Sequence, residues 1–377
     1  MGKSTRESAA AAPSTLRPIA FFIPGLNGGG AQRVFVTLVN TLVDLTDRPI
    51  HLVTSREGGE FEGLIDERVV RVSLGHKHVS RSVLSLARYI RMARPEGMIS
   101  TLNYCNVIFL LSAILARVPV RRVIREANVL QEDFGSGASK KQAALLRILM
   151  RLLYRHADEL IIITKDVERS LTRHRIAPLG RIHRIPNPVN VETATDAPSE
   201  FEAPPRARFV LAIGRISYQK GFDILVRAFA QVKDLDIFLV ILGGGDTKEL
   251  ESLAEQLGVA ERVVFKGFVP NPVEYLQAAS LFVLSSRWEG FSNALAEALA
   301  VGCPIVAVDC PGSSREVLDN GRLGRLAPAG DPAALAKAMT EELDSPSASL
   351  EARKLWARQY APEEIGKRYL EVLTRQS

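Results

Sequence analysis

Short apolar runs alternate with amphipathic stretches of helical length along most of this chain. The first run, Ile19–Ile23, is followed by a glycine-rich turn and by apolar residues at helical spacing over 31–42. Such alternation is typical of a parallel β-sheet with helices on both faces. Further strands are predicted at residues 50–53, 97–100, 122–124, 159–164, 209–213, 238–242, 263–266, 281–284 and 305–308.

One segment, residues 187–207, interrupts this pattern. It is rich in Pro, Ala and acidic residues and lacks periodicity, as an interdomain linker does. A chain of 377 residues is also too long for one ordinary domain. We therefore expect two parallel-sheet domains, 17–190 and 208–355, after a disordered N-terminus over 1–16. Ligands of such sheets bind at the carboxyl ends of the strands, so a shared ligand would lie in a cleft between the domains.

Charge is distributed unevenly between the two halves. Residues 1–190 hold 28 Lys and Arg against 16 Asp and Glu, whereas the remainder holds 20 against 26. A basic first half points to an anionic surface or substrate, although an uneven solvated surface explains it equally well. The three cysteines are too few and too irregularly spaced for a disulfide framework, which favours a reducing, cytoplasmic setting. No signal peptide is recognisable in residues 1–16, and the longest apolar run, 107–116, is too short to span a bilayer.

Two cations follow the predicted strand at 209–213. Gly214 and Arg215 end this strand, and Lys220 comes five residues after Arg215. Arginine offers a planar fork and lysine a point charge, so both can converge on one anion, most simply a diphosphate. The alternative is a pair of surface cations near a helix start, and this loop alone does not decide between them.

A second constellation follows the predicted strand at 281–284. Gly290, Ser292 and Asn293 form a turn and helix cap, which leaves backbone N–H groups free to bind an anion. Glu289 precedes this helix and Glu297 lies inside it among apolar neighbours. Carboxylates suit sugar and ribose hydroxyls because each accepts several hydrogen bonds. An exposed helix position would be the plain alternative for Glu297, but a Glu in a largely buried helix needs a partner.

Other sequence features exclude competing kinds of site. The glycines of 25–30 lack both the Lys-Ser/Thr of a P-loop and the spacing of a dinucleotide fingerprint, which disfavours an NAD-dependent dehydrogenase. Asp234 and Asp236 precede a strand and so lie at the edge away from the cleft. The histidines show no metal spacing beyond His76 and His78 in a polar loop, and no serine nucleophile elbow is present. We expect no metal and no nucleic-acid partner.

The order of three motifs resembles the retaining glycosyltransferases of family 4, the glycosyl transferases of group 1. These motifs are Gly-Arg-x4-Lys-Gly from Gly214, Glu-Gly-Phe-x-Asn-x3-Glu from Glu289, and the segment 302–309; residues 28–33 resemble the family's Gly-Gly-Ala-Glu-Arg loop. The resemblance covers nearly the whole chain after residue 17. It implies the GT-B fold, two Rossmann-like domains facing a central cleft, with the C-terminal segment 356–377 crossing back onto the first domain as a helix.

The resemblance also implies roles for individual residues. Arg215 and Lys220 would bind the diphosphate of a nucleotide sugar, Glu289 the transferred sugar and Glu297 the ribose. Arg215, Lys220 and Glu289 are the catalytic candidates. The full set of donor-binding candidates is Gly28, Gly29, Gly214, Arg215, Lys220, Glu289, Gly290, Phe291, Ser292, Asn293, Ala294, Leu295 and Glu297. Family members need no metal or other cofactor, and positive groups of the protein take its place.

The chain departs from the family at one point in the first domain. Many relatives carry a His near the reacting sugar, where this sequence has Arg125-Glu126-Ala127-Asn128. We transfer no catalytic His and note Glu126 and Asn128 as acceptor-side candidates. The donor is expected to be a UDP-sugar carrying a hexose or N-acetylhexosamine. A GDP-sugar transferase of mannosyl type and a sugar-nucleotide-binding protein without turnover are the alternatives.

Residues 140–156 combine basic and apolar residues at helical spacing. Arg147, Arg151 and Arg155 recur every four residues, and leucines fill another face. A basic amphipathic helix in a basic domain fits a protein that rests on the inner, anionic membrane surface, and a core-packed helix with a solvated arginine stripe fits equally well. If the helix rests on the membrane, we expect the acceptor to be a lipid-linked glycan or polysaccharide of the cell surface. The protein would then be cytoplasmic and peripheral to the inner face of the membrane.

Overall fold

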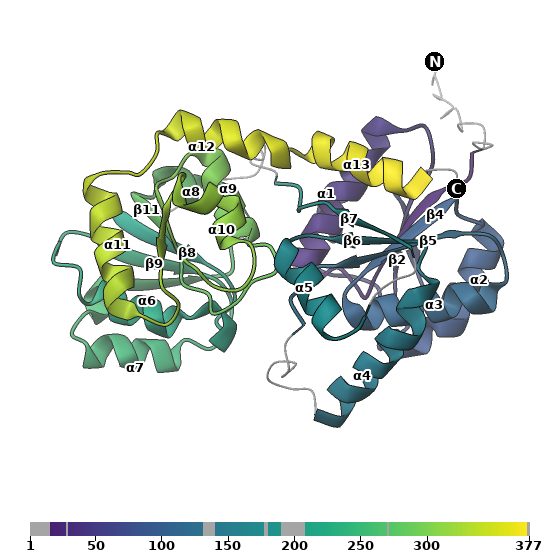
Figure 1. Ribbon diagram of the computed structural model, residues 1–377, viewed down its shortest axis with the longest axis horizontal. Coiled ribbons are helices and arrows are strands. Elements are labelled where there is room, and N and C mark those ends of the chain that lie inside the picture. Colours follow the sequence, from purple (N-terminus) through teal and green to yellow (C-terminus); the bar gives the residue numbers. More distant parts are fainter. Residues whose placement is uncertain are drawn as a thin grey trace, which may run out of the picture.

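The computed structural model describes residues 16–27, 29–130, 140–176, 180–189, 208–269 and 271–374. It contains two lobes side by side, each built on one parallel sheet (Figure 1). The expectation of two parallel sheets is therefore confirmed. Residues 1–15, the linker residues 190–207 and Gly28 lie outside the described part of the chain.

The first sheet has seven strands in the order β3-β2-β1-β4-β5-β6-β7, all parallel. Helices α1 and α13 pack on one face of this sheet, and α2 and α3 on the other, with α4 against α3. The elements are β1 Ile19–Ile23, α1 Gly30–Leu45, β2 Ile50–Thr54, β3 Val70–Ser73, α2 Val83–Ala93, β4 Gly97–Thr101, α3 Asn103–Ala116, β5 Arg121–Glu126, α4 Lys140–Leu153, β6 Glu159–Ile162, α5 Lys165–Arg173 and β7 Arg181–Arg184.

The second sheet has six strands in the order β10-β9-β8-β11-β12-β13, again parallel. Helices α6, α7 and α11 cover one face, and α8, α9 and α12 the other. The elements are β8 Phe209–Ile213, α6 Phe222–Phe229, β9 Phe238–Leu242, α7 Lys248–Gln256, β10 Val263–Gly267, α8 Val273–Ala278, β11 Leu281–Leu284, α9 Asn293–Val301, β12 Ile305–Val308, α10 Ser314–Val317, β13 Arg325–Ala327, α11 Pro332–Asp344, α12 Leu350–Ala357 and α13 Pro362–Thr374.

The chain ends by returning to the first lobe. Helix α12 packs on α9 of the second lobe, and α13 packs on α1, β4 and β5 of the first (Figure 1). The segment is not the single helix that the sequence suggested. A short 3₁₀ turn, Arg358–Tyr360, separates the two helices, because Pro362 cannot continue α12 and instead begins α13.

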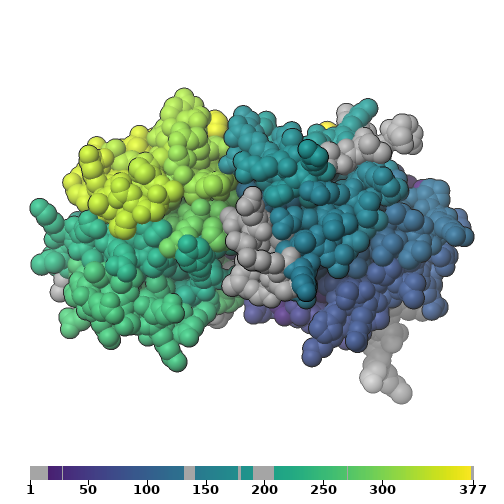
Figure 2. Space-filling model, turned by 60° about the horizontal axis from the view of Figure 1, so that its bottom comes forward, coloured from purple at the N-terminus to yellow at the C-terminus, as the bar shows by residue number. Residues whose placement is uncertain are grey.

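Each sheet reverses its strand order beside its first strand. β1 lies between β2 and β4, and β8 lies between β9 and β11. At such switch points the following loops diverge to opposite faces and leave a crevice at the carboxyl ends of the strands. The crevices of both sheets face the junction of the lobes, where a surface view shows them in contact (Figure 2).

Candidate functional site

Lys220 reaches the junction from the loop after β8. Two bonds tie this loop to the loop after β11: Ser285 Oγ donates to the Lys220 carbonyl at 2.8 Å, and Gln219 Nε2 donates to the Trp288 carbonyl at 3.0 Å. Gly221 allows the close approach, since it adopts φ +62° and a Cβ there would lie 2.2 Å from the Ser285 oxygen. The two loops thus form one rigid unit.

Glu289 is the acidic centre of that unit. Its side chain is 5% exposed, and its Oε1 accepts hydrogen bonds from Lys220 Nζ at 2.6 Å and from Ser286 Oγ at 2.6 Å. Within the described residues no hydrogen bond reaches Oε2, so this oxygen is available to a ligand hydroxyl. Arg215, by contrast, is exposed and makes no side-chain hydrogen bond or ion pair with a described residue. It belongs to the same loop after β8 as Lys220.

The N-terminus of α9 borders the same space. Ser292 is its N-cap, with Oγ accepting from the Leu295 amide, as the sequence predicts. Phe291 packs edge-on against Tyr360 with ring centroids 5.6 Å apart. Gly290 lies against the first lobe, because a Cβ there would stand 1.7 Å from the Ala127 carbonyl oxygen and 3.1 Å from Asn128 Oδ1.

Glu297 lies one turn inside α9 and is 5% exposed. Arg33 of α1 is its ion-pair partner, with Nη1 3.2 Å from Oε1. Burial raises the pKa of Glu297 and the charge of Arg33 acts in the opposite direction. The buried carboxylate that the sequence singled out thus takes its partner from the other lobe.

Three more contacts join the lobes around this point. Asn187 Nδ2 donates to Asn293 Oδ1 at 2.6 Å, and the Gly312 amide donates to Asp166 Oδ2 at 2.9 Å. Gly30, the first residue of α1, faces Asn293 as well, since a Cβ there would lie 3.4 Å from Asn293 Nδ2. The N-termini of α1 and α9 therefore converge from opposite lobes, and both carry positive helix-dipole ends.

The two acceptor-side candidates occupy different settings. Asn128 is exposed and lies beside Gly290. Glu126 is 3% exposed and accepts hydrogen bonds from the Tyr154 hydroxyl and from Asn106 Nδ2, which lies 2.9 Å away. Burial raises its pKa to about 7. The position of Glu126 therefore corrects the expectation that it faces an acceptor, because β5 directs this side chain inward to α3 and Tyr154.

Several residues of the junction had no role in the sequence analysis. The lobes are joined by Arg33, Asp166 and Asn187. Arg125 positions Asn187 by donating a hydrogen bond to its side-chain oxygen. The Arg125 guanidinium is fully buried and donates to Asn187, to Thr101 Oγ1 at 2.9 Å and to the Tyr369 hydroxyl at 3.0 Å. The only sequence signal was the proximity of Arg33 to the glycine-rich loop.

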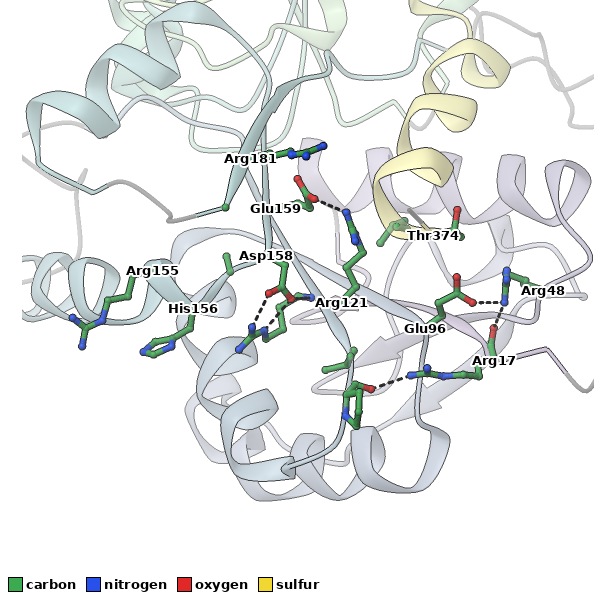
Figure 3. A pocket seen from close by; sticks show the side chains of 16 residues that line it. Arg17, Arg48, Glu96, Arg121, Arg155, His156, Asp158, Glu159, Arg181 and Thr374 are labelled. Carbon is green, nitrogen blue, oxygen red and sulfur yellow. Dashed lines mark hydrogen bonds and ion pairs between the residues drawn. The ribbon is translucent and has the colours of Figure 1, made fainter. Parts of the chain in front are cut away.

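A large cavity lies elsewhere, at the amino ends of β4 to β7 (Figure 3). Its volume is about 1000 Å³ and arginines dominate its lining. Each of its acids is neutralised by an arginine: Glu96 by Arg48, Asp158 by Arg122 and Glu159 by Arg121. The cavity is therefore lined by ion pairs, and it lies at the edge of the sheet opposite the junction.

Metal binding and membrane spanning leave recognisable patterns of residues. Among the described residues, no cluster of three or more His, Cys, Asp or Glu is arranged to hold a metal ion. No helix in the described ranges combines the length and apolarity needed to cross a bilayer.

Comparisons with known proteins match both lobes. Residues 195–360 match the family model of glycosyl transferases group 1, and residues 29–188 match that of the glycosyl transferase 4-like domain. One similar protein is the N-acetylgalactosamine-N,N'-diacetylbacillosaminyl-diphospho-undecaprenol 4-alpha-N-acetylgalactosaminyltransferase of Campylobacter jejuni, 29% identical over 82% of this chain and 86% of the relative. The phosphatidyl-myo-inositol mannosyltransferase of Mycobacterium leprae is 37% identical over 41% of this chain and 42% of its own length.

A solved structure supports the same conclusion for the fold. Anabaena Alr3699/HepE in complex with UDP and glucose superimposes with a TM-score of 0.78 at 18% identity, covering 96% of this chain and all of that one. Two family models follow one another along the chain, and the fold of the solved structure is shared over nearly its full length. The chain belongs to the group 1, family 4 glycosyltransferases and is a glycosyltransferase with the GT-B fold.

Proposed function

We propose that this enzyme moves a hexose or N-acetylhexosamine from a nucleotide diphosphate sugar, with retention of anomeric configuration, to a lipid-linked or polysaccharide acceptor. The observation that carries the proposal is the Lys220–Glu289 ion pair at the N-terminus of α9. It brings a cation, a carboxylate and a helix N-terminus to one place, and these three groups suit a diphosphate joined to a sugar.

The donor would lie along α9. Lys220, Arg215 and the first turn of α9 would bind the diphosphate, and Lys220 has three N–H groups, so it can keep Glu289 as a partner. Glu289 would accept from the transferred sugar through Oε2, and Glu297 would accept from the ribose. Because the ribose hydroxyls need the carboxylate that Arg33 contacts, donor binding would loosen the Arg33–Glu297 pair.

The chemical step follows from the charges around the diphosphate. The bond between the anomeric carbon and the diphosphate oxygen breaks, and a bond from the acceptor hydroxyl forms on the same face of the sugar. The leaving phosphate oxygen accepts the proton of that hydroxyl. Arg215, Lys220 and the α9 amides would stabilise the negative charge that develops on the leaving group, so we propose that no metal is needed.

UDP is the favoured nucleotide. The solved neighbour binds UDP and glucose, and the Campylobacter relative is named for N-acetylgalactosamine transfer. The mycobacterial mannosyltransferase keeps a GDP-sugar open as the second candidate. The test is a thermal-shift panel of UDP, GDP and their sugars, since a ligand at 100 times its Kd stabilises the fold by about 2.7 kcal/mol. A rise in Tm with UDP-sugars supports the proposal, and no rise with any nucleotide sugar refutes it.

The acceptor is proposed to be lipid-linked, at the inner membrane surface. Helix α4 packs on α3 and projects from the bottom of the first lobe in the view of Figure 1. It exposes Leu145, Ile148 and Leu152, whereas Leu146, Leu149 and Leu153 pack on the core. The neighbouring α3 exposes Leu111, Ile114 and Leu115. Exposed apolar side chains next to a row of arginines suit the surface of an anionic membrane, and the Campylobacter relative is named for a diphospho-undecaprenol acceptor.

A further inference from the structure

Arg56 has an unusual setting within the first lobe. It follows β2 at the carboxyl edge of the sheet, and its backbone amide donates to the Pro24 carbonyl at 3.2 Å. Its side chain is half-buried, and its Nε is fully buried without any hydrogen-bond acceptor. A buried N–H without an acceptor costs about 1–3 kcal/mol. The fold thus keeps an unsatisfied donor beside the glycine-rich loop.

The direction of this side chain is fixed by its neighbours. It crosses the end of β1, because a Cβ on Gly25 would lie 2.6 Å from Arg56 Nε and 2.8 Å from its Cγ. Beyond β1 lies Tyr104, in the first turn of α3. Burial raises the pKa of Tyr104 to about 12, and the charge of Arg56 acts in the opposite direction. Arg56 therefore reaches from β2 toward the centre of the cleft edge.

No group in the described part of the chain neutralises this charge. Within the described residues Arg56 makes no ion pair and no side-chain hydrogen bond. Glu57 and Glu60, next in the same loop, are exposed and do not pair with it. Most other arginines near the first sheet are neutralised or hydrogen-bonded, as Arg48, Arg121, Arg122 and Arg125 are. The half-buried Arg56 side chain thus carries a charge without a partner among the described residues, at the carboxyl edge of the sheet, and this charge can receive an anion from outside.

We propose that Arg56 binds a phosphate group of the acceptor, beside the donor's diphosphate and separate from it. The proposal rests on the proposed function, since it names the chemistry of the second substrate in the same cleft. The donor's diphosphate is matched by Lys220, Arg215 and α9 in the other lobe. The planar guanidinium suits a phosphate better than a neutral sugar hydroxyl, because it offers parallel N–H donors and a full charge.

Such a phosphate has two possible sources. It is either the diphosphate of a lipid carrier or the phosphate of a small soluble sugar phosphate. Both present the same oxygens to Arg56, so the experiment uses one probe of each kind: geranyl diphosphate and glucose 1-phosphate. Saturating UDP, or GDP if only that nucleotide binds, fills the donor site first, so that neither probe binds there.

The test is calorimetric titration of each probe into the nucleotide-loaded full-length protein. At least one probe should bind the wild type, with Kd about 10–100-fold weaker in Arg56→Gln and partly restored in Arg56→Lys, as for loss of one charge-assisted hydrogen bond. Arg88→Gln, at an exposed position on α2, should bind as the wild type does. Nucleotide affinity should be equal in all four proteins, which shows that Arg56→Gln folds.

Each outcome has a separate meaning. Binding of geranyl diphosphate alone assigns the phosphate to a lipid carrier, and binding of glucose 1-phosphate alone assigns it to a soluble acceptor. Nucleotide binding with no probe binding, or probe binding unchanged in Arg56→Gln, overturns this inference and leaves the donor assignment standing. Failure of the wild type to bind any nucleotide overturns the proposed function and this inference together.

Discussion

Arg33 and Glu297 meet across the two lobes, with Arg33 Nη1 3.2 Å from Glu297 Oε1. Glu297 is buried in α9 and Arg33 comes from the first turn of α1. The carboxylate proposed to hold the donor's ribose therefore serves, without a ligand, as a bridge between the domains. If Glu297 holds the ribose as proposed, donor binding and this contact between the lobes use the same carboxylate.

Nucleotide binding should therefore depend on pH through Glu297. Burial raises its pKa above 4.5, and only the carboxylate can accept from two ribose hydroxyls. UDP affinity should fall as pH drops through this raised pKa, and Arg33→Gln should move the midpoint to higher pH, because Arg33 favours the charged form. Calorimetry between about pH 5 and pH 8 measures both midpoints. In Glu297→Gln, UDP affinity should change with pH only through the titration of the nucleotide itself. The same pH dependence in this variant as in the wild type would refute the role of Glu297.

Gly290 should tolerate no side chain. A Cβ would lie 1.7 Å from the Ala127 carbonyl oxygen, so Gly290→Ala must push the lobes apart. We expect turnover to fall by about 10²-fold or more, as when reacting groups are misplaced by about 1 Å, and the radius of gyration from X-ray scattering to increase. Gly63→Ala is the matched control, because nothing lies within 4 Å of its Cβ. Normal activity of Gly290→Ala would show that catalysis does not need this contact.

The C-terminal helix should contribute to the junction through Arg125. Tyr369 of α13 accepts from Arg125, which donates in turn to Asn187, the partner of Asn293. Tyr369→Phe leaves one buried N–H of a charged group without an acceptor, so unfolding should cost about 1–3 kcal/mol less. Urea denaturation measures this change. Tyr218→Phe, at a residue 72% exposed, is the control and should change stability little. Equal free energies of unfolding for the two variants would show that the hydrogen bond between Tyr369 and Arg125 does not stabilise the protein.

Membrane binding should depend on the exposed residues of α4. Flotation with vesicles containing phosphatidylglycerol should recover the wild type, and recovery should fall in the triple variant Leu145→Ser, Ile148→Ser, Leu152→Ser and in Arg147→Glu with Arg151→Glu. Leu355→Ser, equally exposed on α12 of the other lobe, is the control. If every variant floats as well as the wild type, or if the wild type itself does not float, the proposed membrane binding through α4 is wrong.

Interior strands were predictable from sequence, whereas three of the four edge strands were not; the exception is β10, predicted at 263–266. β1, β8, β9, β11 and β12 are continuous apolar runs, and their predicted bounds agree with the structure. The edge strands β3, β7 and β13 were missed, because their exposed positions hold Arg71, Arg181 and Arg325, which interrupt the apolar pattern. Strand prediction thus succeeds where burial on both faces demands apolar residues.

The candidate site was predictable only within the second lobe. Ser292 as a cap and Glu297 as a buried acid follow from local sequence, and both features are present. The partners Arg33, Asp166 and Asn187 come from the first lobe, and their positions depend on how two domains dock, which no local pattern encodes. Glu126 was misplaced for a related reason: the side of β5 on which it lies depends on Tyr154 and Asn106.

The most direct test of the account is transfer from UDP-sugars by variants of the Lys220–Glu289 pair. With the sugar that gives the largest thermal shift, Lys220→Ala and Glu289→Ala should each lower kcat by about 10²-fold or more, the loss expected for one preorganised electrostatic group. Lys233→Ala, at an exposed lysine of the same lobe, should keep the wild-type rate. Wild-type turnover in both Lys220→Ala and Glu289→Ala would contradict the assignment of the catalytic site.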